Sequence, residues 1–468
     1  MPTFGMVVRS ADSEHFYFMH YDLLYGQIIA YAADPVPRWV ELGRQRGVPI
    51  SRDEWHRAKV WVRGSRMTAY LDGRRLLTVQ DSRFAAGLVG LRCDAGLAEF
   101  RRMSAQGQVR PLQKEWVNKV SKRDWVVVCD GGRGKFAAWP DLLWLPRASG
   151  RGRLLCCLYQ GYAHGSPPTD EFPNCGKMVS VFSDDWGKTW SKPMTTVDTE
   201  ADDHDGHLAL LKDGRLLCNY FAEQFYQERK GKRVRIEGNA AWRFDICLIE
   251  SRDGGKTWRE PRVVATPWKY CSATAGKIIE LPEGDLLMPV YGWEAGGANA
   301  GVGVVRSGDG GQTWGAVKLL VSGLPAGSAN EMALLRLDDG RLLALIRPQM
   351  LQAYSSDEGR TWTAPVQAGV AGHAPCLIQT REGRLVYGIR TAGQGYATGV
   401  VVSDDRGATW QGPYQVDTVS GAYPGLAELP DGSIYIVYYE EGAGSRIRGK
   451  RFRLQRDGIE LLPLEQWR

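Results

Sequence analysis

Several ionisable side chains of this sequence stand beside strand-like apolar runs, where burying a charge is costly unless it has a partner or a function. Glu331 heads the run MALLRL, Asp141 opens DLLWLP, and Asp205 lies in DDHDGHLALL. His164 follows another apolar run, and Trp139 offers a flat face on which a sugar ring can stack. Together these residues predict a polar pocket, lined by carboxylates and imidazole, that binds a sugar.

The histidines of this set allow alternatives. His164 could act as an acid or a sugar ligand, or it could be a hydrogen-bonded structural group. His204 and His207 stand three apart in HDGH, where a regular strand would turn them to opposite sides. We therefore assign no metal site and expect no cofactor.

The elements that must position these side chains repeat six times from about residue 125 onward. Each copy is an apolar run, a Gly-containing turn and a second apolar run: LLWLPRASGRGRLLCCLY, LALLKDGRLLCNYF, IIELPEGDLLMPVYG, ALLRLDDGRLLALIR, LIQTREGRLVYGIR and LAELPDGSIYIVYY. A DG or EG pair between two such runs supplies the positive φ that a tight reversal needs. Each copy therefore predicts a β-hairpin.

A second motif, S-x-D-x-G-x-T-W, follows each of the first five hairpins. Its copies are SDDWGKTW (183–190), SRDGGKTW (251–258), SGDGGQTW (307–314), SSDEGRTW (355–362) and SDDRGATW (403–410). The Asp can accept hydrogen bonds from the turn backbone, the Gly permits a left-handed conformation, and the Trp can cover the turn. Because active sites do not repeat, we interpret the motif as a fold stabiliser.

Two hairpins per repeat make a four-stranded sheet, and six such sheets predict an all-β chain with a six-bladed β-propeller at residues 125–468. The last copy lacks the turn motif. We expect RIRGKRFRL near the C-terminus and WVVVCD at 125–130 to complete this sixth sheet. Such a closure would join both ends of the propeller and protect its edge strands.

Residues 1–105 form a different unit. WHRAKVWVRGSRMTAYLDGRRLLTVQD alternates as strands do, with LDG as a hairpin turn. The segment resembles the second half of a laminin-G or concanavalin-like jelly roll, which implies a smaller β-sandwich, short for a complete one. Residues 106–124 read as a polar linker.

The chain from about 125 to 460 resembles the sialidase (neuraminidase) superfamily, whose six-bladed propellers carry repeated Asp boxes. SGAYPGLAELPDGSIYIVYYE matches the segment that carries the family's nucleophilic tyrosine, which implies Tyr423. SANEMALLRLDDGRLLALIR implies Glu331 as the residue that polarises this tyrosine and Arg347 as a clamp for the sugar carboxylate. Arg390 at the end of GRLVYGIR is a second clamp candidate. A neutral phenol can approach an anomeric centre beside a carboxylate without charge repulsion.

The sequence also departs from this family. The Arg-Ile-Pro element that supplies the first clamp corresponds to FAAWPDLLWLP, with Ala138 in place of the Arg and only Arg133 nearby. A bidentate Arg is hard to replace in carboxylate recognition, so this departure argues against sialic acid as the substrate. The acid/base Asp would fall in GYAHGSPPTDEFPNCGKM, where Asp170 is our candidate and Glu171 the alternative.

Composition narrows the partners. Lys plus Arg is 59 and Asp plus Glu is 53, so the net charge of +6 is thinly spread and predicts no nucleic-acid partner. No apolar stretch reaches the roughly 18 residues of a membrane span, and the N-terminus lacks a signal-peptide pattern. We expect a soluble chain, exported if upstream sequence is missing and otherwise cytoplasmic. Nine scattered Cys predict mostly reduced thiols.

The leading hypothesis is an exo-acting glycoside hydrolase that releases a terminal acidic or modified sugar from a glycan. In it Tyr423 and Glu331 act as the nucleophile pair. One alternative is a polysaccharide lyase, or a glycosidase built on His164, Asp141 and Asp205. Another is a propeller that binds glycans without catalysis.

Overall fold

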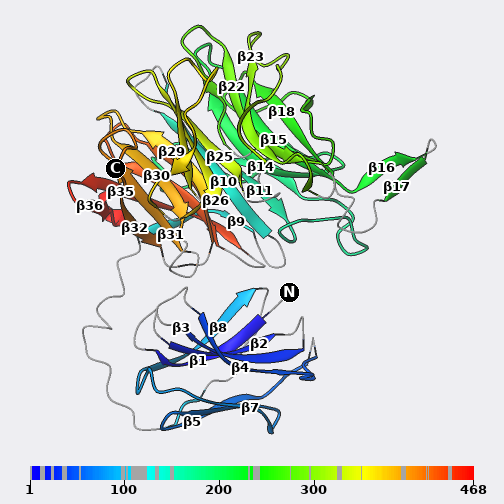
Figure 1. Ribbon diagram of the computed structural model, residues 1–468, viewed down its shortest axis with the longest axis vertical. Helices are drawn as coiled ribbons and strands as arrows, with labels where there is room; N and C mark the ends of the chain where they lie inside the picture. Colours follow the sequence, from blue (N-terminus) through cyan, green and yellow to red (C-terminus); the bar gives the residue numbers. More distant parts are fainter. Residues whose placement is uncertain are drawn as a thin grey trace. The chain divides into compact units, whose positions relative to one another are not determined.

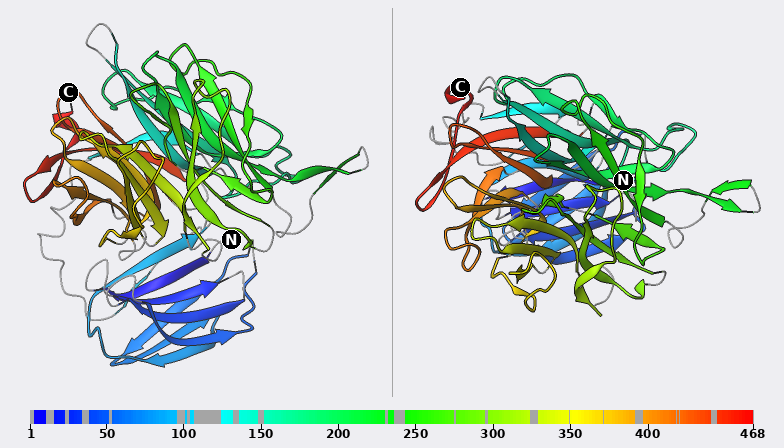
Figure 2. Two further views of the ribbon diagram at one scale, coloured as in Figure 1. Left: turned by 45° about the horizontal axis from the view of Figure 1, so that its top comes forward. Right: turned by 90° about the horizontal axis from the view of Figure 1, so that it is seen from above.

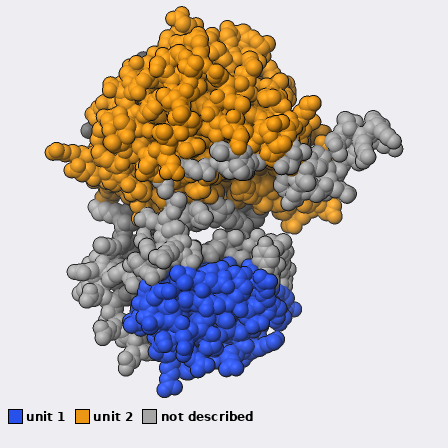
Figure 3. Space-filling view, in the orientation of Figure 1, with its two compact units in different colours: residues 1–121, 392–395 blue, residues 122–391, 396–468 orange. Residues whose placement is uncertain are grey.

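The computed structural model describes residues 3–467 except 11–15, 23–25, 34–38, 52–53, 96–100, 102–103, 107–123, 132–135, 148–151, 230–231, 236–242, 275, 295–296, 324–328, 349, 371, 392–396, 418, 420 and 441–444. The described chain divides into two compact units, one within residues 1–121 and one within 122–391 and 396–468 (Figure 3). Most of the expected linker at 106–124, together with Arg133, lies outside the described residues.

The first unit is a sandwich of two antiparallel sheets (Figure 1). Five strands in the order β4-β3-β2-β1-β8 form one sheet: β1 (Thr3–Ser10), β2 (Phe16–Asp22), β3 (Gln27–Ala33), β4 (Trp39–Arg46) and β8 (Leu88–Ala95). The other sheet contains β5 (Ala58–Arg63), β6 (Arg66–Leu71) and β7 (Arg74–Gln80). Met19 and Ile28 of the first sheet share one buried core with Met67, Ala69 and Val79 of the second. The narrower resemblance to a jelly roll stays a prediction.

The second unit is a six-bladed propeller, in agreement with the sequence analysis (Figures 1 and 2). Blade 1 contains β10 (Phe136–Leu145), β11 (Arg153–Gly161), β12 (Lys177–Ser183) and β13 (Met194–Val197). Blade 2 contains β14 (Asp202–Leu210), β15 (Leu216–Gln224), β18 (Arg243–Ser251) and β19 (Arg262–Val264). Blade 3 contains β20 (Cys271–Ala273), β21 (Ile279–Glu280), β22 (Leu286–Trp293), β23 (Gly301–Ser307) and β24 (Lys318–Ser322).

Blade 4 contains β25 (Ala329–Arg336), β26 (Leu342–Pro348), β27 (Leu351–Ser355) and β28 (Val366–Gln367). Blade 5 contains β29 (His373–Gln379), β30 (Leu385–Arg390), β31 (Thr398–Ser403) and β32 (Gln411–Asp417). Blade 6 contains β33 (Gly421–Glu428), β34 (Ile434–Glu440), β35 (Arg446–Gln455) and β36 (Gly458–Leu461), and a 3-10 turn follows at Leu464–Gln466. A separate hairpin, β16 (Tyr226–Arg229) and β17 (Lys232–Arg235), projects from blade 2 (Figure 1).

All six predicted hairpins are present as the first two strands of each blade, with β21 and β22 in blade 3. The ring closes as expected, because β9 (Trp125–Asp130) pairs with β35. One feature was not predicted: β18 makes a short parallel pairing with β20, so blades 2 and 3 merge into one hydrogen-bonded sheet.

The five S-x-D-x-G-x-T-W segments each connect the last two strands of blades 1 to 5. In the blade 2 copy, the Gly255 amide donates to Ser251 Oγ over 2.9 Å, and Thr257 donates its amide and hydroxyl to the two oxygens of Asp253. The motif glycines have φ between 85° and 89°, in the left-handed region that favours glycine. The motif therefore builds a self-contained turn, as its residue types predict.

Candidate active site

The first strand of five described blades carries the same irregularity, a β-bulge in which two residues face one residue of the neighbouring strand. In β10 the register steps from Ala138 to Asp141 while β11 advances by only two residues, and β14, β25, β29 and β33 repeat this step. The bulged pairs are Trp139–Pro140, Asp205–Gly206, Asn330–Glu331, Ala374–Pro375 and Tyr423–Pro424. Equivalent positions of several blades are thereby turned out of the regular strand pattern.

Three of these bulges hold a non-glycine residue in the left-handed region. Trp139, Asp205 and Tyr423 have φ of 47°, 47° and 46°. This backbone conformation costs about 1–3 kcal/mol for such residues and is concentrated at functional sites. The residue that follows each of them is Pro or Gly, as the printed sequence shows.

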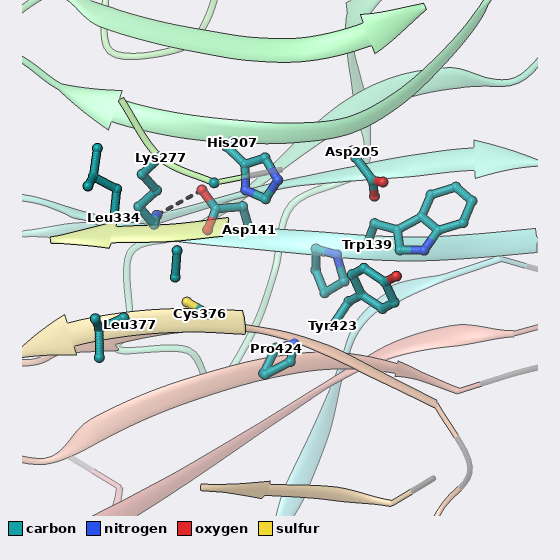
Figure 4. Close-up of a pocket in the computed structure, with 13 residues that line it drawn as sticks. Trp139, Asp141, Asp205, His207, Lys277, Leu334, Cys376, Leu377, Tyr423 and Pro424 are labelled. Carbon is teal, nitrogen blue, oxygen red and sulfur yellow. Dashed lines mark hydrogen bonds and ion pairs between the residues drawn. The ribbon is translucent and has the colours of Figure 1, made fainter. Parts of the chain in front are cut away.

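All three strained residues line one pocket, whose empty space of about 500 Å³ includes a part open to solvent. The lining residues are Trp139, Pro140, Asp141, Asp205, His207, Gly276, Lys277, Ala333, Leu334, Cys376, Leu377, Tyr423 and Pro424. In Figure 4, Trp139, Asp205 and Tyr423 form one group, while Asp141, His207, Lys277 and Cys376 form another. The pocket therefore has two chemically different parts.

Tyr423 and Glu331 meet as the sequence analysis expected. The Tyr423 hydroxyl donates a hydrogen bond of 3.0 Å to Glu331 Oε1. Burial, with the nearby Glu331 carboxylate, raises the pKa of the Tyr423 phenol well above its usual range. The phenol is therefore neutral near pH 7, and the proton it would lose during an attack already points at a carboxylate oxygen.

Glu331 is 5% exposed and has a cationic partner. Arg347 of β26 donates a hydrogen bond from Nη2 to Glu331 Oε1 over 2.8 Å. Its Nε also lies 2.6 Å from Glu331 Oε2, an ion-pair contact whose geometry is not that of a hydrogen bond. Burial alone would lower the pKa of Arg347, but the Glu331 carboxylate raises it overall. The buried acid is thus charge-compensated, which its isolated position in the sequence predicts.

Arg347, His373 and Arg390 form the cationic side of this site. Arg347 Nη1 lies 3.2 Å from His373 Nδ1, and His373 pairs with Arg390 across β29 and β30. Burial and the two guanidinium groups lower the pKa of His373, so its imidazole is neutral near pH 7. Arg390 donates to the Gly421 carbonyl and to the Tyr439 hydroxyl, each over 2.6 Å. Both predicted clamp arginines therefore lie close to Tyr423 or Glu331.

Asp205 has a pKa that suits proton transfer near neutral pH. Burial, together with repulsion from the Glu331 carboxylate, raises the pKa of Asp205 to about 7. A carboxyl group with this pKa is partly protonated near neutral pH and can both give and take a proton. The sequence analysis placed Asp205 in the pocket as a substrate-binding residue and gave it a catalytic part only in the alternative built on His164, Asp141 and Asp205.

The other part of the pocket is held by an ion pair that joins three blades. Lys277 donates from Nζ to Asp141 Oδ2 over 2.7 Å and to the Leu142 carbonyl over 2.9 Å, and the Leu208 amide also donates to Asp141 Oδ2. Burial, reinforced by Lys277, lowers the pKa of His207 to about 4, so His207 is neutral. Asp141 lines the pocket as expected, but its Oδ2 is engaged in the fold.

His164 and Asp170 lie differently from the pocket residues. His164 is an exposed loop residue whose ring lies 4.7 Å from that of Trp139, edge to face. Asp170 and Glu171 are exposed in the same loop and are not among the pocket-lining residues. Ala138 is fully buried beside Trp139. The structure therefore brings together Tyr423, Glu331, Arg347, Arg390, Asp205 and Trp139 but leaves Asp170 apart, and its role stays a prediction.

Asp202, His204 and Glu223 form a buried cluster whose ligand-type atoms all lie within 4.8 Å of one another, a spacing that a metal ion could use. His204 Nε2 lies 2.8 Å from Asp202 Oδ2 and 3.5 Å from Glu223 Oε2. Burial opposes the charge on His204, but the two carboxylates raise its pKa to about 10. The protonated imidazole of His204 can therefore itself supply the positive charge beside Asp202 and Glu223. The bulge at Asp205 separates His204 from His207 along β14.

Sequence reasoning missed Lys277 and did not predict the raised pKa of Asp205. Lys277 in blade 3 follows a Gly and occupies the position that Asp141 occupies in blade 1. Most of the other blades have an apolar residue at this position. The Pro or Gly that follows each strained residue is a visible signal of the bulges. No local signal gives the pKa of Asp205, because it arises from burial and from Glu331 two blades away.

Comparisons with known proteins agree with this fold. Residues 233–436 match the family described as BNR repeat-like domain. No curated protein matches the sequence. Within the part of the chain that the structure describes, no helix has both the length and the hydrophobicity needed to cross a membrane.

Many solved structures are similar, among them the following three. A Dyadobacter fermentans protein of unknown function is 21% identical over 71% of this chain and 99% of its own, with a TM-score of 0.56. The NanB sialidase of Streptococcus pneumoniae is 12% identical over 97% of this chain and 93% of its own (TM-score 0.55). An α-L-arabinofuranosidase of Fusarium graminearum is 16% identical over 72% of this chain and 99% of its own (TM-score 0.51). At these identities the likeness shows the fold alone, and that fold agrees with the six-bladed propeller described above.

Proposed function

We propose that this protein is an exo-acting glycosidase in which Tyr423 is the nucleophile, Glu331 accepts its proton and Asp205 is the general acid and base. The observation that carries the proposal is the 3.0 Å hydrogen bond from the Tyr423 hydroxyl to a buried, arginine-paired Glu331. A glycosidase fold supports the same class of reaction.

In the first half of the proposed reaction, Tyr423 Oη attacks the anomeric carbon while its proton moves to Glu331 Oε1. Asp205 gives its proton to the leaving oxygen, and the bond between that oxygen and the sugar breaks. In the second half, the Asp205 carboxylate takes a proton from water, which attacks the same carbon. The bond to Tyr423 breaks and the phenol recovers its proton from Glu331, so the protein returns to its starting state.

Asp205 is better suited than Asp170 to act as the general acid. Asp205 is 8% exposed, lines the same pocket as Tyr423 and has a pKa of about 7. Asp170 is exposed on a loop. A general acid must hold its proton at the working pH and reach the leaving oxygen, and burial beside the nucleophile favours both.

A terminal sugar with an acidic or modified substituent is the substrate class that we favour. Arg347 and Arg390 place two guanidinium groups beside the Tyr423–Glu331 pair, and Arg390 also lies 5.4 Å from the Tyr423 ring centre. The first clamp of the sialidases is replaced by Ala138, so the anionic group would be held from one side only.

Hydrolysis of a panel of 4-methylumbelliferyl glycosides tests the proposal. The panel contains a sialoside, a glucuronide and an α-L-arabinofuranoside, because the similar structures include a sialidase and an arabinofuranosidase. We expect at least one glycoside to be cleaved. Tyr423→Phe should lower kcat by about 10³-fold or more, and Glu331→Gln should lower it by about tenfold or more.

Tyr414→Phe is the matched control, since it removes a phenol oxygen on β32 outside the pocket. Its kcat should equal that of the wild type. Full activity of Tyr423→Phe would contradict the mechanism. Binding of a glycan without any product would favour the non-catalytic alternative, and a rise in ultraviolet absorbance with uronic-acid polymers would favour a lyase.

A further inference from the structure

The outer face of the three-stranded sheet β5-β6-β7 in the first unit has an unusual composition. Along β5 the side chains alternate, with Lys59, Trp61 and Arg63 exposed and the intervening residues partly buried. The residues of β6 and β7 on the core side, Met67 and Val79 among them, pack into the core of the sandwich. The opposite side of the same strands is therefore a solvent-facing surface.

The register of the three strands arranges this surface in three rows. One row contains Lys59, Tyr70 and Arg75, the middle row contains Trp61, Thr68 and Thr78, and the last contains Arg63, Arg66 and Gln80. Rows two residues apart along a strand lie roughly 6.7 Å apart, so the two outer rows are separated by about 13 Å. We call these nine residues the basic face.

Trp61 lies at the start of the middle row and is 44% exposed. Thr68 beside it is buried, at 3% exposed, and its hydroxyl is hydrogen-bonded to that of the partly buried Thr78 over 3.1 Å, so Trp61 is the most exposed side chain of this row. An exposed indole is a surface on which a sugar ring can stack.

The basic face carries four cations and no carboxylate. Lys59, Arg63, Arg66 and Arg75 are all exposed, and no ion pair with a described carboxylate neutralises any of them. Lys59 Nζ instead lies 5.6 Å from the Tyr70 ring centre. Elsewhere in the unit some charges are paired, as Arg44 is with Glu41 and His56 is with Asp72. The unpaired cations on both sides of Trp61 complement an anionic ligand that is long enough to cross all three rows.

We propose that the basic face binds an acidic polysaccharide, with one sugar ring stacked on Trp61 and carboxylate or sulfate groups held by the cations of the outer rows. An exposed indole with exposed cations in the rows on either side suits an acidic sugar chain. Single-stranded nucleic acid is usually bound by several stacking aromatics along a longer basic groove. This inference goes beyond the proposed function and does not require the propeller pocket to be catalytic.

Titration of the full chain with four probes tests the inference: heparin, polygalacturonate, neutral dextran and oligo-dT, each at 50 and 300 mM NaCl. We expect heparin or polygalacturonate to bind, with lower affinity at the higher salt concentration, and dextran not to bind. Trp61→Ala should weaken binding about tenfold or more, and the double variant Arg63→Gln/Arg66→Gln should do the same without removing the stacking surface.

Lys188→Gln/Lys192→Gln, which removes two exposed cations of the propeller, is the matched control and should bind as the wild type does. Tyr423→Phe should also bind normally, which separates this surface from the pocket. The inference is overturned if neither acidic polymer binds, if the two basic-face variants keep full affinity, or if oligo-dT binds more tightly than both polysaccharides. Circular dichroism of each variant establishes that its sheets are intact.

Discussion

At the scale of single residues, the proposed chemistry depends on two carboxyl groups, those of Glu331 and Asp205, that have different surroundings. Glu331 has Arg347 as a partner and accepts the Tyr423 hydrogen bond. Asp205 has no such cationic partner at hydrogen-bond distance among the described residues, and burial beside Glu331 raises its pKa to about 7. In the proposed mechanism these different surroundings suit Glu331 to accept a proton and Asp205 to donate one.

The pH dependence of kcat/KM follows from the Asp205 assignment. The protonated form of Asp205 is the active acid, so activity should fall as the pH rises through about 7. Asp205→Asn should remove this alkaline limb and lower activity most for substrates with poor leaving groups. Profiles between pH 5 and 9 measure the effect.

Asp203→Asn is the control for this experiment. Burial also raises the pKa of Asp203 to about 7, but its carboxylate bonds to Thr199 and does not line the pocket. This variant should keep the alkaline limb of the wild type. An unchanged limb in Asp205→Asn would assign the titration to another group.

The positions of the candidate site residues relative to one another were predictable where a sequence motif contained them. Tyr423, Glu331 and Arg347 lie together as their segments implied. The raised pKa of Asp205 was not predictable in this way, because it depends on burial and on Glu331, and the role of Asp170, which stands in the expected loop, stays a prediction. Neither cause is local in the sequence.

At the scale of elements, the hairpins and turn motifs were predictable because their causes are local. A Gly between apolar runs, or a Ser, Asp and Gly at fixed spacing, specifies a turn within eight residues. The bulges were not predicted, although Pro or Gly marks most of them, because a bulge is defined by its partner strand.

Gly359 tests the turn motif in blade 4. Its φ is 85°, and a Cβ there would approach Leu287 Cδ1 to 3.0 Å, so Gly359→Ala should lower the free energy of unfolding by about 1–2 kcal/mol. Gly308→Ala, at the variable second position of the blade 3 motif and without a left-handed φ, should change it by less than about 0.5 kcal/mol. Urea denaturation compares the two, and equal effects would contradict a conformational role for the motif glycine.

At the scale of the whole molecule, closure of the propeller and the cross-blade contacts hold the site. β9 pairs with β35 across more than 300 residues of sequence, and Lys277 ties blade 3 to Asp141 of blade 1. The closure was predictable from the missing sixth turn motif. The Lys277 contact was not, since only the assembled ring brings these residues together.

Val128 of β9 tests the closure. It is 3% exposed in the core between blades 1 and 6, so Val128→Asp would bury an unpaired charge and release β35 from its partner strand. We expect a loss of about 3 kcal/mol or more in unfolding free energy and increased light scattering. Val263→Asp on β19, where Val263 is 68% exposed, should change neither property. Equal stability of both variants would mean that β9 does not close the ring.

The most direct test of the central claim is mass spectrometry of the protein after reaction with a slow substrate. The probe is a ring-fluorinated glycosyl fluoride of whichever sugar the glycoside panel shows to be released, since fluorine slows breakdown of a glycosyl-enzyme. We predict one sugar per chain, attached to the peptide that contains Tyr423 and absent from Tyr423→Phe. A sugar attached to Glu331 or Asp205, or turnover of the probe with no adduct on Tyr423, would contradict the account.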